Sequence, residues 1–192
     1  MSNTASHCGM EGAVDSMAAY LQDATNGLNA VLTEIRTESS LTAGQLPAVL
    51  QFDVDQVIVD RTPAIFVVAT AFRDATGESA GRTNSPGRRK GEVDLEVLLY
   101  IRGADLTHDS ARSQEATVQR AAYRYGAALH RLLTARPARG QSLNGGSGRG
   151  LNRIVNVFGF TQDLTVVTDQ DGNVTEPNRI LMTTISVRTS EE

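Results

Sequence analysis

Hydrophobic residues between Met10 and Glu38 recur at helical spacing. Successive apolar positions alternate between steps of four and three residues, which places them on one side of a helix: Met10, Val14, Met17, Leu21, Ala24, Leu28, Val31 and Ile35. We therefore expect one helix over residues 10–38. Gly27 is its weak point, because glycine costs roughly 1 kcal/mol relative to alanine inside a helix. The stripe is expected to pack on the protein's own sheet, although its narrow width also fits a coiled-coil seam.

Extended segments are expected within residues 52–102. The run Phe52–Asp60 is rich in β-branched residues, and Ala64–Arg73 is almost continuously apolar, as in a central strand. In Glu92–Arg102, apolar and polar residues alternate, which predicts a strand with one apolar side. That side carries Val93, Leu95, Val97, Leu99 and Ile101, and the other carries Glu92, Asp94, Glu96 and Arg102, joined by Leu98 and Tyr100.

A second helix is expected over residues 109–135. Asp109 or Ser110 can cap its start, and Pro137 stops it. Its apolar stripe comprises Ala111, Val118, Ala122, Tyr125, Leu129 and Leu132. Three extended runs follow: Ile154–Phe160, Leu164–Asp169 and Ile180–Arg188. Between the second and the third run, Asp171-Gly172 predicts a tight turn.

These segments predict a single α+β domain over residues 1–192. Its sheet is expected to be mixed or mostly antiparallel, with about five to six strands, and to be flanked by two main helices. Residues 1–9 are expected to form a flexible arm, and residues 153–188 the closing strands. Two long Gly/Arg-rich loops, 74–91 and 136–152, separate the regular elements, and loops of that length are usually functional or disordered.

Charge and composition narrow the classes of function. The net charge of −4 argues against a general nucleic-acid binder. A single cysteine, Cys8, excludes an internal disulfide. No run of 18 or more apolar residues is present, so no membrane span is expected, and the first residues lack the pattern of a secretory signal.

Basic residues gather in the two loops. Of the 18 basic residues, 17 are Arg and one is Lys. The first cluster comprises Arg82, Arg88, Arg89 and Lys90, and the second comprises Arg136, Arg139, Arg149 and Arg153. Either cluster could contact DNA phosphates or acidic strips on a neighbouring subunit. The acidic side of the 92–102 strand, with Glu92, Asp94 and Glu96, could receive a neighbour's arginines. Solvated loops and a solvated sheet face are the plain alternatives.

No residues have the spacing of a catalytic, cofactor or metal site. His7 and Cys8 are adjacent, but no further ligands stand at zinc-site spacing. His108-Asp109-Ser110 holds the residue types of a catalytic triad, yet consecutive residues at a turn cannot adopt that geometry. The glycine-rich run 145–150 follows a helix, whereas a phosphate loop precedes one. One predicted strand carries three carboxylates, those of Asp53, Asp55 and Asp60. They could bind a divalent cation, but carboxylates along a strand more commonly form a solvated face.

The order of these segments resembles the tail terminator, or tail completion, proteins of tailed bacteriophages. The resemblance covers roughly residues 10–188 and rests on layout, because the family has no signature motif. The matching pieces are the opening helix GMEGAVDSMAAYLQDATNGLNAVLTEI, the hairpin AIFVVATAFR…EVDLEVLLYIR, the helix SARSQEATVQRAAYRYGAALHRLLTAR and the final strands ending in ILMTTISVRT.

The resemblance implies a structural virion protein and no enzymatic activity. It implies a homohexameric ring in the phage neck that caps the tail tube, stops its polymerisation and joins the tail to the head. The implied partners are further copies of the chain, the tail tube protein and a head-closure or connector protein, with non-specific DNA contact in the lumen. Such a protein is made in the host cytoplasm and ends in the virion. The alternatives are an adaptor or head-closure protein, and a cytosolic module that dimerises through the Met10–Ile35 stripe.

Overall fold

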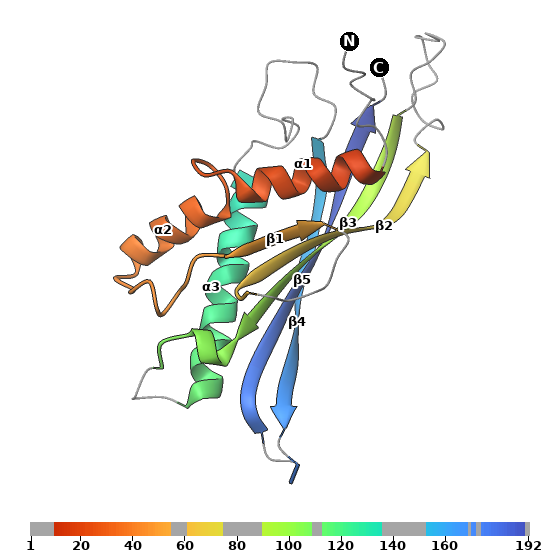
Figure 1. The fold of residues 1–192 in the computed structure, drawn as a ribbon. Helices are drawn as coiled ribbons and strands as arrows, with labels where there is room; N and C mark the ends of the chain where they lie inside the picture. Colours follow the sequence, from red (N-terminus) through yellow and green to blue (C-terminus); the bar gives the residue numbers. More distant parts are fainter. Residues whose placement is uncertain are drawn as a thin grey trace, which may run out of the picture.

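A mixed β-sheet with helices packed against one face forms the body of the protein (Figure 1). The computed structural model describes residues 10–54, 61–74, 90–108, 113–135, 153–168, 170–171 and 174–190. The α+β class predicted from the sequence is confirmed. The elements are α1 (Met10–Gln22), α2 (Leu28–Glu38), β1 (Gln51–Val54), β2 (Ala64–Asp74), β3 (Lys90–Arg102), the 3-10 turn η1 (Gly103–Asp105), α3 (Gln114–Ala135), β4 (Arg153–Thr168) and β5 (Val174–Ser190).

The described strands form one sheet in the order β1-β2-β3-β5-β4. Strand β1 runs parallel to β2, and the other neighbouring pairs are antiparallel. The register of β3 and β5 is unbroken from Lys90 opposite Ser190 to Arg102 opposite Asn178. Between β2 and β3 the register shifts at Thr70, which is the extra residue of a β-bulge.

The core lies between this sheet and the helices. The alternation predicted for β3 is confirmed, because the five residues on its apolar side are fully buried: Val93, Leu95, Val97, Leu99 and Ile101. Leu181, Ile185 and Val187 of β5 lie on the same face and are also buried. Helices α1, α2 and α3 close this layer with residues such as Met17, Leu32 and Leu129. Burial of apolar surface at roughly 25 cal/mol per Å² therefore favours the helix-on-sheet layering.

The prediction of one helix over residues 10–38 is wrong, because the chain forms two helices separated by residues 23–27. The carboxylate of Asp23 accepts the backbone N–H groups of Thr25 (2.9 Å) and Asn26 (2.6 Å), which competes with the helical pattern. A Cβ at Gly27 would lie 2.4 Å from the carbonyl oxygen of Asp23, so this turn requires glycine. The predicted apolar stripe is split as a result, and Ala24 is exposed.

Helix α3 confirms most of the second predicted helix, but its described cap is a different residue. Ser113 accepts the backbone N–H of Ala116 with its Oγ at 3.2 Å, as an N-cap residue does. Asp109 and Ser110, the predicted caps, lie outside the described residues. The apolar stripe is confirmed at Val118, Ala122, Tyr125, Leu129 and Leu132, all of which are buried.

The closing segment forms two long strands instead of the three predicted runs. Strand β4 continues through residues 161–163, which separated two of those runs in sequence, and β5 begins at Val174. Register shifts between Val157 and Phe160 accommodate the irregular stretch of β4. The predicted turn is described at Asp171, and Gly172 lies outside the described residues. Residues 1–9, 75–89 and 136–152, where the flexible arm and the two Gly/Arg-rich loops were predicted, also lie outside the described residues. The predicted strand Phe52–Asp60 is described as far as Val54, within β1, and its residues 55–60 lie outside the described residues.

Candidate interaction surfaces

The predicted acidic row lies on the sheet face opposite the helices, and its central member is bonded within the chain. Asp94 is only 8% exposed and accepts a hydrogen bond of 2.6 Å from Ser186 Oγ on β5. It also forms an ion pair with Arg73 of β2. The bulge residue Thr70 donates its hydroxyl to the backbone oxygen of Asp94 at 3.2 Å. These contacts join β2, β3 and β5 around Asp94.

The two other acidic positions differ in their cross-strand neighbours. Glu92 lies between Arg73 on β2 and Arg188 on β5 in the register of the sheet. Glu96 lies between uncharged residues, Val68 and Thr184. Opposite charges placed across neighbouring strands attract each other, so the row is partly balanced by the chain's own arginines. A contact between this row and a neighbour's arginines stays a prediction.

Most of the predicted basic residues lie outside the described residues: Arg82, Arg88, Arg89, Arg136, Arg139 and Arg149. Lys90 and Arg153 are described in their backbone, as the first residues of β3 and β4. Lys90 pairs with Ser190, and Arg153 pairs with Arg188, so both lie at the same end of the sheet. Both Gly/Arg-rich segments therefore join the sheet at this one end (Figure 1).

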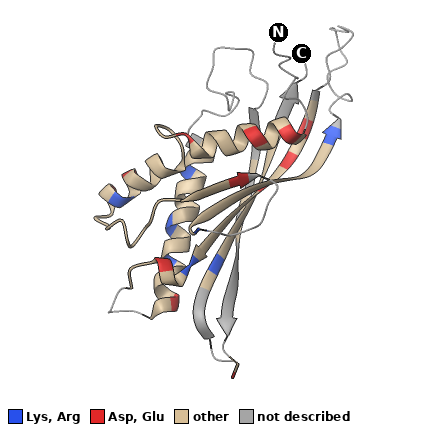
Figure 2. Cartoon of the chain, viewed as in Figure 1, with Lys and Arg blue, Asp and Glu red and all other residues tan. Residues whose placement is uncertain are grey.

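Charge is distributed unevenly over the helices (Figure 2). Helix α1 contains Glu11 and Asp15 but no Lys or Arg, and both acidic residues are exposed. Helix α3 contains three arginines and a single acidic residue, Glu115 in its first turn. Tyr123 on α3 is 60% exposed. The acidic side of α1 was missed in the sequence, although the four-residue spacing of Glu11 and Asp15 places them on one side of a helix.

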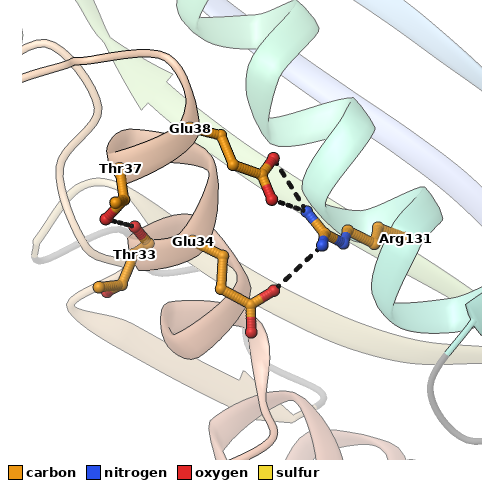
Figure 3. A network of polar contacts seen from close by, with 5 residues as sticks. All are labelled: Thr33, Glu34, Thr37, Glu38 and Arg131. Carbon is orange, nitrogen blue, oxygen red and sulfur yellow. Dashed lines mark hydrogen bonds and ion pairs between the residues drawn. The ribbon is translucent and has the colours of Figure 1, made fainter.

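One arginine of α3 is held by the neighbouring helix α2 (Figure 3). Arg131 Nη1 donates to both carboxylate oxygens of Glu38, at 3.0 and 3.2 Å, and its Nη2 lies 3.4 Å from Glu34 Oε2. The hydrogen bond with Glu38, followed by the charge of that group, raises the pKa of Arg131. This network clamps two helices together, so these groups act structurally.

Tyr125 is the largest fully buried side chain of the described core. Its hydroxyl donates to the backbone oxygen of Pro47 at 2.6 Å, which joins α3 to the segment before β1. Burial raises the pKa of Tyr125 well above the ordinary value of 10.0. The residue therefore stays neutral under ordinary conditions and serves packing and hydrogen bonding.

The possible cation site is described in part. Asp53 of β1 accepts a hydrogen bond from Gln51 Nε2, while Asp55 and Asp60 lie outside the described residues. Within the described ranges, no three His, Cys, Asp or Glu residues group closely enough to hold a metal ion. His108 is exposed, and His7 and Cys8 are not described.

No known protein-family model matches this sequence, and no curated protein is significantly similar to it. Among the helices described, none has the length and apolar character needed to cross a membrane. Function is therefore inferred from the fold and its surfaces.

Proposed function

We propose that this chain is a structural protein of a tailed-phage neck, in which copies form a ring that caps the tail tube. The ring stops polymerisation of the tube protein and joins the tail to the head connector. The proposal rests on the resemblance in element order, and the fold supports it. Helix, strands, helix and closing strands follow one another in the expected order within an α+β fold.

The observation that carries the self-assembly part is the unequal charge of different surfaces. Subunits of a closed ring contact each other head to tail, so each subunit must offer two different, complementary surfaces. Acidic residues are exposed on α1, whereas basic residues predominate on α3 (Figure 2). The same charges could pair in a symmetric dimer, so the number of copies in the oligomer decides between ring and dimer.

The polar contacts within the fold also support a structural role. Asp94 and Tyr125, which are buried, and Arg131, which lies at the surface, make contacts that join elements of this chain to one another. In a catalytic site, the reacting groups converge on a place where a substrate can bind. Here the three groups make three separate contacts between elements of the fold, so we propose that the protein acts without making or breaking bonds.

The shape and the oligomer mass of the purified protein test the ring. Negative-stain electron microscopy is expected to show closed rings with a central opening, and native mass spectrometry is expected to give six copies. A stable monomer or dimer at every concentration would exclude the ring. The pairing of copies through the Met10–Ile35 stripe is disfavoured, because Val14, Met17, Leu21, Leu28 and Val31 are buried in the chain's own core.

We further propose that the Gly/Arg-rich loops, 74–91 and 136–152, contact neighbouring subunits or line the lumen through which DNA passes. Replacing Arg88 and Arg89 by Glu should weaken assembly if the loops bind acidic surfaces of a neighbour. An unchanged oligomer mass would remove that role. Salt-sensitive retardation of DNA by the assembled ring would support the lumen position, and no retardation at low salt would count against it.

A further inference from the structure

Helix α1 presents a single acidic stripe to solvent. From Glu11 to the end of the helix, its exposed residues follow one another at steps of four, four and three: Glu11, Asp15, Ala19 and Gln22. These steps place the four residues on one side of the helix. The opposite side, with Val14, Met17 and Leu21, is buried against the core. Neither acidic residue forms an ion pair within the described part of the chain.

Helix α3 presents a matching stripe of opposite character. From Arg120 onward, its exposed residues follow at steps of three, four and three: Arg120, Tyr123, Ala127 and His130. Arg120 has no ion-pair partner among the residues described, and the single acid of α3, Glu115, lies 3.8 Å from Arg179. The stripe therefore keeps a net positive charge.

Tyr123 makes this stripe more than a solvated basic surface. It is 60% exposed and shares this surface with an arginine. The other large hydrophobic side chains that the structure describes as exposed are Met10, Leu50 and Phe72. Tyrosine and arginine are the residues most enriched where proteins bind one another, because they combine apolar area with a hydrogen-bonding or charged end. An exposed tyrosine one helical turn from an unpaired arginine is therefore a candidate anchor for a protein partner.

We propose that the α3 stripe of one copy docks on the α1 stripe of a neighbouring copy. This inference deepens the proposed ring and rests on its head-to-tail assembly. The two stripes match in length, at about 15 Å each for a rise of about 1.5 Å per residue. Arg120 would pair with the carboxylates of Glu11 and Asp15, and Tyr123 would pack over Ala19, which is small enough to let the helices approach. Charge complementarity commits the surface to a second copy of this chain.

A charge swap tests the contact. Arg120→Glu and Asp15→Arg should each weaken assembly at least tenfold, measured as the concentration at half-assembly by light scattering and sedimentation. The two changes in one chain should recover most of that loss, because the pair is restored with its charges exchanged. The matched control is Arg102→Glu, which replaces an exposed arginine at the C-terminal end of β3, outside both helices, and should leave assembly unchanged. Unaltered assembly in the single variants, or a swap weaker than either of them, would overturn the contact.

Cross-linking tests the same contact without depending on a stable ring. In a Cys8→Ser background, chains with Asp15→Cys and chains with Tyr123→Cys are mixed and treated with a short bis-maleimide. We expect cross-linked dimers when both variants are present, and none from either alone. Dimers from Tyr123→Cys alone would mean a symmetric α3–α3 contact and would overturn the proposal.

The outcomes separate this inference from the proposed function. If the wild-type protein forms rings but the mixed cysteine variants give no cross-link, the contact is refuted and the ring is retained. If the cross-link forms but the protein never closes into rings, the ring is refuted and the α1–α3 contact is retained. If Arg120→Glu abolishes DNA retention and the charge swap does not restore assembly, the stripe is a nucleic-acid surface and the proposal is wrong.

Discussion

The two faces of the sheet differ in what their residues do. On the face under the helices, every described β3 side chain is apolar and fully buried, from Val93 to Ile101. On the opposite face three acidic β3 residues are followed by Leu98 and Tyr100, and of these five Glu92, Glu96, Leu98 and Tyr100 are only partly buried. The first face therefore stabilises the fold by burying apolar side chains. The second face combines hydrogen bonds and ion pairs within the chain with side chains that other molecules can reach.

This contrast also separates polar groups that serve the fold from those that can serve assembly. Asp94 lies on the open face, yet Ser186 and Arg73 already bond it. Glu11, Asp15 and Arg120 lie on the outer sides of helices and have no described ion pair. A partner is therefore expected on the outer sides of the helices more than at the centre of the acidic row.

Truncating one leucine on each face gives the largest expected difference. Leu99→Ala removes a fully buried side chain and should lower the free energy of unfolding by about 2–5 kcal/mol. Leu98→Ala, its neighbour on the open face, should cost about 1 kcal/mol, because Leu98 is only partly buried. Urea denaturation of both variants measures the difference, and equal losses would show that the open face is as well covered as the core.

Removing the bonded carboxylate on the open face should have the next largest effect. Asp94→Ala leaves the buried Ser186 hydroxyl without its partner and should cost about 1–2 kcal/mol. The ion pair adds little to this loss, because Arg73 is 61% exposed on its side chain and solvent screens it. Glu96→Gln is the control and should stay within about 0.5 kcal/mol of wild type. If the control costs as much as Asp94→Ala, the distinction drawn between the two acids fails.

The hydrogen bond of Tyr125 predicts a smaller loss with a distinctive pH dependence. Tyr125→Phe removes the bond to Pro47 and should cost about 1 kcal/mol at neutral pH. In the wild type the pKa of Tyr125 is raised in the folded state, so its stabilisation is complete below the unfolded-state pKa of 10.0 and declines above it. Thermal unfolding from pH 8 to pH 11 should therefore show a shallower loss of stability in Tyr125→Phe. Parallel profiles would mean that another group controls the alkaline loss.

The smallest effect is expected at the exposed clamp between α2 and α3. Arg131→Gln breaks the ion pairs with Glu38 and Glu34, which lie at the surface. Salt screens exposed pairs, so the difference from wild type should shrink as ionic strength rises. Thermal unfolding in low and high salt measures it. A loss that salt does not reduce would show that Arg131 contributes by packing instead of by charge.

Sequence periodicity predicted the elements whose surroundings are uniform. Strand β3 alternates because one of its faces meets the core along its whole length, and the apolar stripe of α3 follows the same logic. The break before α2 was missed, because the apolar spacing continues across it. The local signal was present in Asp23 and Gly27, one a side chain that binds nearby backbone N–H groups and the other the residue that the turn requires.

The polar contacts were less predictable than the elements, since they depend on register. To predict the pairing of Asp94 with Arg73 and Ser186, one must know which strands are neighbours and that Thr70 forms a bulge. Strand β4 was divided wrongly because its residues 161–163 are polar, and an edge strand tolerates polar residues that a central strand would not. The acidic stripe of α1 was predictable from spacing alone.

The length of tail tubes shows whether this chain acts by capping a polymer, as we propose. Phage particles are assembled with and without an intact gene for this chain, and tail lengths and head attachment are measured by electron microscopy. If the chain caps the tail tube, tubes made without it should lose their uniform length and stay unattached to heads, and the wild-type chain supplied in trans should restore both. Tails of normal length joined firmly to heads in its absence would show that it is not the cap.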